Sequence, residues 1–226
     1  MSTKHFALIL AGCGHLDGAE ITEASALNIA LSKAGYTVSF YAPNRHQKDT
    51  IEHLSGEELT QNRNILEEAA RIARGNIKPI EELTLSEVDG IAMAGGFGVI
   101  KNFTNFLDKG LHASLQPDIG DKIKEAIVTK KPLIAICAAP MAVAIALKEL
   151  GIQDATLTFG KAANAEGFLS ALKEWDIDHI ETSLNEAYTD PQHAIITSGA
   201  YMDSNATPYE IFLGAEACVN AMSALS

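Results

Sequence analysis

Short apolar runs that alternate with helical patterns constrain the fold of this chain more than any other feature. Residues 6–10 form such a run, residues 21–34 repeat apolar side chains at helical spacing, and residues 37–42 return to β-branched and aromatic types. This order predicts a βαβ unit, in which the two strands are parallel. Parallel sheets are covered by helices on both faces. The sequence therefore predicts an α/β fold with a mostly parallel central sheet.

The rest of the chain continues this alternation without a linker that would mark a domain boundary. We expect one domain over residues 1–226, with a polar and charged peripheral excursion at about 44–86. The further expected strands are 88–94, 132–136, 155–159, 187–189 and 193–197, and the further expected helices are 65–75, 141–150, 168–175 and 211–222.

The amino-acid composition limits which classes of binding partner and which cellular compartments are expected. Lys and Arg number 17 against 29 Asp and Glu, so the net charge is −12 at pH 7, which disfavours nucleic acid and membrane surfaces. Three cysteines without a CxxC pair and seven scattered histidines predict neither a disulfide framework nor a metal site. The apolar run that starts at residue 6 is too short for a signal peptide. We expect a cytoplasmic protein, although an organelle form without its transit peptide would look the same.

Cys137 is the strongest candidate for chemistry. It directly follows the apolar run 133–136 and directly precedes a helical pattern, so the thiol is expected at the carboxyl edge of the sheet. Open α/β sheets bind ligands at that edge. The positive end of the following helix would lower the thiol pKa and make the sulfur nucleophilic. The alternative is a small buried hydrophobic residue in a turn.

Two further loops are expected at the same edge. Glu20 follows the loop after the first strand, where a carboxyl close to a thiol can exchange a proton with it; alternatively, it is an acidic residue favoured in a first helical turn. Gly95 and Gly96 allow a ligand to approach the backbone, or simply form a tight turn. Cys13 lies in the loop before Glu20, either as a pocket residue or as a thiol without a role.

Three motifs, at 12–21, 94–98 and 136–141, occur together with matching segments at 54–57, 64–75 and 197–202. On these residues the chain resembles the ElbB family, also called isoprenoid-biosynthesis glyoxalase or sigma cross-reacting protein. That family belongs to the superfamily of PfpI peptidase-like proteins and the Parkinsonism-associated deglycase. The resemblance runs from the first strand to the last helix. It implies a three-layer sandwich of the class I glutamine amidotransferase-like, flavodoxin-like type.

The resemblance also implies roles for individual residues. Cys137 would be the nucleophile and Glu20 the acid/base, while the amides near Gly95 and Gly96, together with the Ala138 amide, would form an oxyanion hole. The peptidase-like members carry His where this chain has Ala138, so peptidase chemistry loses its base. The pattern His-x-Glu at 179–181 imitates true glutaminases, but it precedes a strand pair, and we do not expect it to be catalytic.

The activity that the resemblance implies is a cofactor-free, glutathione-independent glyoxalase, a lyase of the hydro-lyase type, that converts methylglyoxal or glyoxal to a hydroxyacid. The expected partner is a small reactive aldehyde, with no nucleic acid, membrane or metal and with a homodimer left open. The alternative is a non-catalytic redox or stress-response protein that senses through oxidation of Cys137. A glutaminase is least favoured, because a histidine beside the nucleophile is missing.

Overall fold

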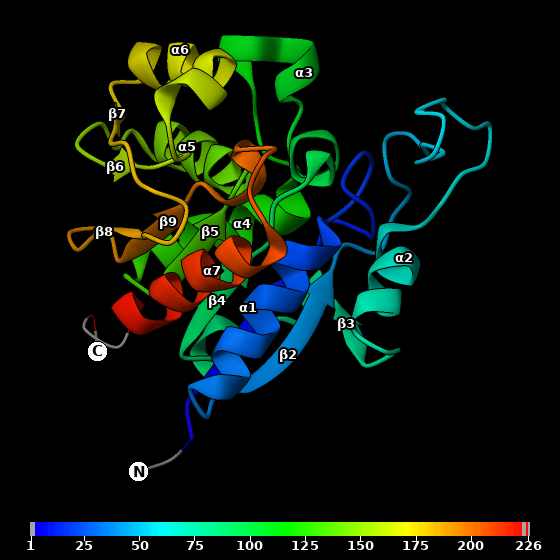
Figure 1. Ribbon diagram of the computed structural model, residues 1–226, viewed down its shortest axis with the longest axis horizontal. Coiled ribbons are helices and arrows are strands. Elements are labelled where there is room, and N and C mark those ends of the chain that lie inside the picture. Colours follow the sequence, from blue (N-terminus) through cyan, green and yellow to red (C-terminus); the bar gives the residue numbers. More distant parts are fainter. Residues whose placement is uncertain (1–2, 223–224, 226) are drawn as a thin grey trace.

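The computed structural model describes residues 3–222 and 225, and its centre is a sheet in the order β3-β2-β1-β4-β5-β9-β8 (Figure 1). Neighbouring strands are parallel except β8 and β9, which are antiparallel. The strands of this sheet are β1 His5–Ile9, β2 Thr37–Ala42, β3 Ile77–Pro79, β4 Gly90–Met93, β5 Leu133–Ile136, β8 Tyr188–Asp190 and β9 Ile195–Ser198. The expected α/β fold with a mostly parallel sheet is confirmed.

Helices cover both faces of the sheet and complete the three layers. Helices α1 and α7 pack against each other on the face nearer the viewer in Figure 1, and α4 packs against α5 on the far face. The helices are α1 Ile21–Lys33, α2 Ile65–Ile72, α3 Phe106–Lys109, α4 Pro117–Val128, α5 Ala139–Leu150, α6 Glu166–Glu174 and α7 Pro208–Met222. No helix within residues 3–222 and 225 has both the length and the hydropathy needed to cross a membrane.

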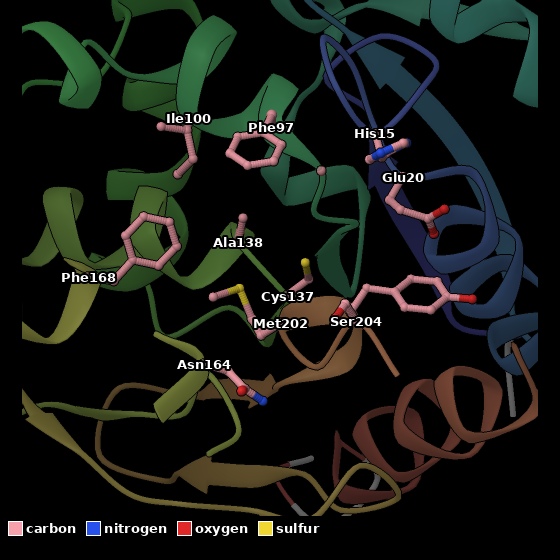
Figure 2. A pocket seen from close by; sticks show the side chains of 12 residues that line it. His15, Glu20, Phe97, Ile100, Cys137, Ala138, Asn164, Phe168, Met202 and Ser204 are labelled. Carbon is pink, nitrogen blue, oxygen red and sulfur yellow. The ribbon is translucent and has the colours of Figure 1, made fainter. Parts of the chain in front are cut away.

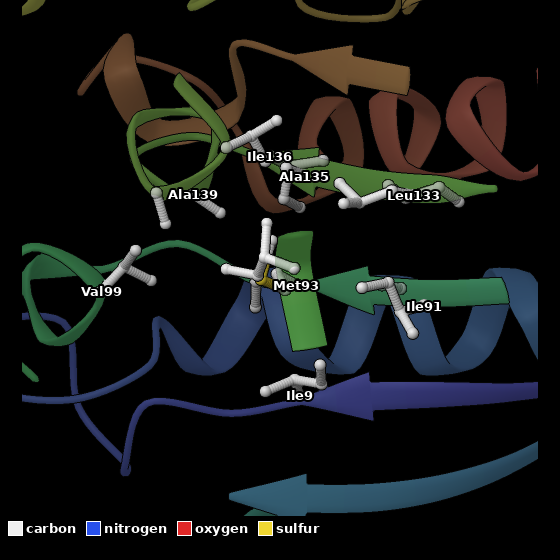
Figure 3. Close-up of a cluster of buried hydrophobic side chains, with 14 of the residues drawn as sticks. Ile9, Ile91, Met93, Val99, Leu133, Ala135, Ile136 and Ala139 are labelled. Carbon is white, nitrogen blue, oxygen red and sulfur yellow. The ribbon is translucent and has the colours of Figure 1, made fainter. Parts of the chain in front are cut away.

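The core lies where the central strands meet these helices (Figure 3). Strands β4 and β5 are buried along their whole length because helices cover both of their sides. Ile91, Met93, Leu133 and Ile136 have no exposed surface. Burial of each such side chain contributes about 1.5–3 kcal/mol, so these strands form a rigid base for the loops that follow them.

Most expected elements are present, and the differences have local causes. The expected strand at 155–159 shortens to β6 Thr156–Leu157, which pairs with β7 Asp178–His179 in a separate two-stranded sheet. Strand β3 was not expected, because three residues are too few to show alternation. Helix α4 was also missed: Gly120 lies inside it and weakens the helical pattern, and Pro117, although favoured at a first helical position, was not recognised as the helix start.

The expected excursion at 44–86 is only partly peripheral. Its last part supplies α2 and the sheet edge β3, whereas residues 46–64 form a loop that projects from the sheet (Figure 1). The buried Asp17 carboxylate holds this loop by accepting hydrogen bonds from Gln47 Nε2 at 3.1 Å and Ile51 N at 2.7 Å. The excursion therefore fastens the loop that joins β1 to α1.

Candidate active site

Cys137 occupies the abrupt turn between β5 and α5. Its φ of +59° lies in the left-handed region, which is rare for a residue with a side chain. Its amide donates to the carbonyl oxygen of Ser198 at 2.9 Å, and the helix starts two residues later at Ala139. Backbone strain of this kind costs on the order of 1–3 kcal/mol and is concentrated at functional sites. The turn presents the thiol at the carboxyl edge of the sheet.

The carboxyl that contacts this thiol belongs to Glu23. Glu23 has no exposed surface, and its Oε2 accepts a hydrogen bond from Gly95 N at 2.9 Å while its Oε1 accepts one from Tyr201 N at 3.2 Å. Burial, with a smaller contribution from the nearby Glu20 carboxyl, raises the pKa of Glu23 to about 7. A carboxyl that is half protonated near neutral pH can both accept and return a proton.

Glu20, the carboxyl expected to face the thiol, has a different position. It is the N-cap of α1, with extended backbone angles, and its Oε2 accepts a hydrogen bond from Glu23 N at 2.7 Å. Its side chain lines the same cavity as Cys137, but among the described residues the carboxyl that interacts with the thiol is that of Glu23. The expected facing carboxyl is therefore corrected from Glu20 to Glu23. The sequence signal that could have identified Glu23 is its position one helical turn before the buried Leu27, on the same face of α1.

The two glycines expected at the oxyanion hole differ in what their amides do. The amides of Gly96 and Ala138 donate to the Cys137 sulfur, beside the position where the resemblance implied an oxyanion hole. The Gly95 amide instead donates to Glu23. Gly95 is a packing position, since an added Cβ would lie 2.6 Å from Cys137 Cβ and 2.9 Å from Glu23 Oε2.

The expected lowering of the Cys137 pKa is wrong. Burial raises the pKa of this thiol well above its usual value, and the Glu23 carboxyl raises it further. Hydrogen bonds from the Gly96 and Ala138 amides act in the opposite direction but are outweighed. The free-energy cost of burying a thiolate away from water is larger than the stabilisation that two amide hydrogen bonds and the N-terminus of a helix provide. Cys137 is therefore a protonated thiol beside its own base rather than a free thiolate.

A cavity of about 480 Å³ opens over the thiol (Figure 2). It brings together residues from the loop after β1, the loop and π-helix after β4, the turn between β5 and α5, the segment that leads into α6 together with α6 itself, and the segment after β9. The lining residues are His15, Glu20, Gly96, Phe97, Ile100, Cys137, Ala138, Asn164, Phe168, Tyr201, Met202 and Ser204. His15, on the first loop, is a lining residue that sequence reasoning did not single out.

The remaining candidates lie elsewhere. Cys13, for which the sequence left a pocket position and a thiol without a role as alternatives, does not line the cavity; it lies near Glu68 and Arg71 of α2, and burial raises its pKa. His179 accepts a hydrogen bond from Phe159 N and Glu181 accepts one from Ala162 N, and neither lines the cavity. His179 and Glu181 therefore do not form a triad with Cys137. In the part of the chain that the structure describes, no group of three His, Cys, Asp or Glu side chains is arranged to hold a metal ion.

Known proteins are similar to this chain over most of its length. The rat (Rattus norvegicus) ES1 protein homolog, mitochondrial, is 35% identical over 87% of this chain and 74% of its own length. The human glutamine amidotransferase-like class 1 domain-containing protein 3, mitochondrial, is 34% identical over 90% and 76%. The crystal structure of an isoprenoid biosynthesis protein with an amidotransferase-like domain from Ehrlichia chaffeensis superposes with a TM-score of 0.89 and 32% identity, covering 99% of both chains. No protein-family model matches the chain.

A more distant structure shares the fold alone. Glyoxalase III from Candida albicans superposes with a TM-score of 0.61 over 98% of this chain and 97% of its own, at 12% identity. Similarity at that level carries no residue roles.

The curated relatives correct the expected location. The rat and human proteins are named as mitochondrial, and so is the ES1 protein of zebrafish (Danio rerio). This finding overturns the expectation of a cytoplasmic protein. That expectation rested on the unpaired cysteines and on the short first apolar run. Unpaired cysteines fit any reducing compartment and do not distinguish one such compartment from another.

Proposed function

Because the chain belongs to the ElbB and ES1 family of class I glutamine amidotransferase-like proteins, we propose that it is a cofactor-independent glyoxalase that converts methylglyoxal or glyoxal to a hydroxyacid. The observation that carries this proposal is the buried pair of Cys137 and Glu23 at the base of the cavity. Cys137 supplies a nucleophile, Glu23 supplies a carboxyl with a pKa of about 7, and the Gly96 and Ala138 amides supply two hydrogen-bond donors beside them. Addition to an aldehyde requires these three kinds of group.

The first step joins the sulfur to the aldehyde carbon. The Glu23 carboxylate accepts the thiol proton as the carbon–sulfur bond forms, and the electron pair of the carbonyl moves onto its oxygen. The amides of Gly96 and Ala138, which face the sulfur, stabilise this alkoxide. The alkoxide then takes the proton back from Glu23 and becomes a hemithioacetal. A high thiol pKa is compatible with this step, because the base is already in contact.

The second step moves a proton between the two carbons. The Glu23 carboxylate removes the hydrogen of the former aldehyde carbon as a proton, and the electron pair forms an enediolate. Glu23 returns the proton to the neighbouring carbon, the hydroxyl proton on the sulfur-bearing carbon passes to the oxygen of that neighbouring carbon, and a thioester of Cys137 results. Water then breaks the carbon–sulfur bond, the hydroxyacid leaves and the thiol regains its proton. The overall change adds one water molecule, so no external oxidant or reductant is needed.

The proposal is tested by measuring lactate formed from methylglyoxal by chromatography, with EDTA present and glutathione absent. We expect turnover by the wild-type protein and none by Cys137→Ser. Cys218→Ser is the matched control, because Cys218 is buried in α7 and does not line the cavity. Lactate formation by Cys137→Ser at the wild-type rate, or a strict need for added metal or glutathione, would contradict the proposal.

A redox-sensing role for Cys137 is the second candidate, supported by the same amides. Peroxide would oxidise the sulfur to a sulfenic and then a sulfinic acid, releasing one water at each stage, and Glu23 and the two amides could hydrogen-bond the new oxygens. The raised pKa of Cys137 disfavours this role, because the thiolate reacts with peroxide. Mass spectrometry after mild peroxide treatment would support it if oxidation occurred at Cys137, and oxidation at Cys13 alone would count against it.

A further inference from the structure

Two sides of the cavity over Cys137 differ chemically, and Asn164, Met202 and Ser204 form a mixed third side (Figure 2). The side chains of Phe97, Ile100 and Phe168 lie on one side of the thiol, and His15 and Glu20 lie on the other. A ligand that fills this space would therefore present a polar end and an apolar end to different parts of the site. Glyoxal has no apolar substituent, and the only apolar part of methylglyoxal is one methyl group.

The size of the cavity leads to the same conclusion. Its volume of about 480 Å³ falls within the range of roughly 300–1,000 Å³ that is typical of sites for drug-sized ligands. A two- or three-carbon aldehyde is about as large as a Leu side chain and would leave most of this space to water. Water that remains beside the thiol would weaken the proton transfers of the proposed reaction.

The apolar wall is not explained by the packing of the fold alone. Phe97 is 50% exposed, and its backbone is fixed by a hydrogen bond from Phe97 N to the carbonyl oxygen of His15 at 2.7 Å. Phe168 is held from behind by the rings of Phe159 and Phe106, at centroid distances of 5.3 and 5.9 Å. The packed ring of Phe168 and the exposed ring of Phe97 thus border a space that the chain itself leaves open.

We propose that the site takes a 2-oxoaldehyde with an aromatic or branched aliphatic substituent, which lies against Phe97, Ile100 and Phe168 while the aldehyde carbon lies at Cys137. The reaction rests on the proposed glyoxalase function, whereas recognition of the substituent rests on the cavity. Binding of the substituent would cover Phe97 and displace the water beside the thiol.

The first test compares kcat/KM for phenylglyoxal and methylglyoxal, measured as mandelate and lactate. We expect the wild-type ratio to favour phenylglyoxal by about tenfold or more, as apolar pockets discriminate by this order. The ratio should fall in Phe97→Leu and fall further in Phe97→Ser. Leu54→Ala is the matched control, because Leu54 is 95% exposed on the excursion loop. A wild-type ratio of about one, or a ratio that Phe97→Ser leaves unchanged, would overturn the inference.

The second test needs no turnover. In a Cys13→Ser background, mass spectrometry follows labelling of Cys137 by N-phenylmaleimide and N-methylmaleimide, each normalised to its rate with a free thiol. We expect a preference for the phenyl reagent that Phe97→Ser removes. Faster labelling by the phenyl reagent without turnover of either aldehyde would support recognition of an apolar substituent and would refute the proposed glyoxalase activity. Equal turnover of both aldehydes with equal labelling would keep the glyoxalase and refute the inference.

Discussion

The turn that carries Cys137 and the loop that carries Cys13 start from the same kind of position and end in different environments. Each follows a parallel strand at the carboxyl edge of the sheet, β5 and β1 respectively. Cys137 contacts Glu23 and two amides at the base of the cavity, whereas Cys13 lies near Glu68 and Arg71 of α2 and outside it.

The difference shows that chain length between strand and helix decides where a thiol goes. Cys137 directly follows the last residue of β5, so the strand itself fixes its position. Cys13 comes four residues after Ile9, in a loop where Gly12 and Gly14 have φ values of +114° and +116°. Such angles are open mainly to glycine, and they let this loop turn toward the excursion. The following predictions test this contrast.

The largest expected effect is on turnover. Glu23→Gln should lower kcat on a 2-oxoaldehyde by about 10²–10⁴-fold, because it removes the acid/base group beside Cys137. Glu20→Gln should lose less, since Glu20 caps α1 and only lines the cavity. Glu181→Gln is the control outside the site and should keep wild-type kcat. Steady-state kinetics that show an inactive Glu20→Gln beside an active Glu23→Gln would reverse the assignment of the two carboxyls.

A second effect concerns the pH dependence of stability. Glu23 has a pKa of about 7 in the folded protein against 4.5 as its usual value, so between these pH values the folded state holds a proton that the unfolded chain releases. The free energy of unfolding should therefore decrease by about 3 kcal/mol as pH rises from 4.5 to 7, and level off above 7. Glu23→Gln should lack this component and Glu181→Gln should keep it. Urea denaturation curves at several pH values measure it; identical pH profiles for the wild type and Glu23→Gln would contradict it.

The third effect is steric. Gly95→Ala should destabilise the protein by about 1–3 kcal/mol and slow turnover, because the new Cβ would lie 2.6 Å from Cys137 Cβ and 2.8 Å from Ala138 N. Gly167→Ala in α6 is the matched control: nothing lies within 4 Å of its added Cβ, so it should be neutral or stabilising. Thermal unfolding compares the two variants. Equal melting temperatures for both would show that the packing between Gly95 and Cys137 is looser than described.

The smallest effect is expected at the other cysteine. Cys13→Ser should change stability by no more than about 0.5 kcal/mol and leave kcat within about twofold of wild type, because Cys13 is partly exposed and does not line the cavity. Iodoacetamide should still inactivate this variant. Protection from inactivation by Cys13→Ser would mean that Cys13 belongs to the reactive site after all.

The sequence predicted the main framework of the site but not its chemistry. The elbow at Cys137 and the Gly-Gly loop were recognisable from short apolar runs that end at reactive or flexible residues. Glu23 was missed because it and Glu20 both lie close to the buried stripe of α1, one turn and two turns before Leu27. The free backbone amides at the helix start draw Glu20 into the capping position, which leaves Glu23 to point at the thiol.

What the sequence determined by itself is the parallel α/β arrangement with Cys137 at the carboxyl edge, because continuous apolar strands have to be covered on both faces and a direct strand-to-helix junction leaves the thiol no other place. Only the tertiary structure decided which carboxyl meets that thiol and in which direction the pKa values of both groups move. Those outcomes depend on desolvation and on hydrogen bonds from Gly95 and Tyr201. Both residues are remote from Glu23 in the chain, so no local pattern around Glu23 encodes them.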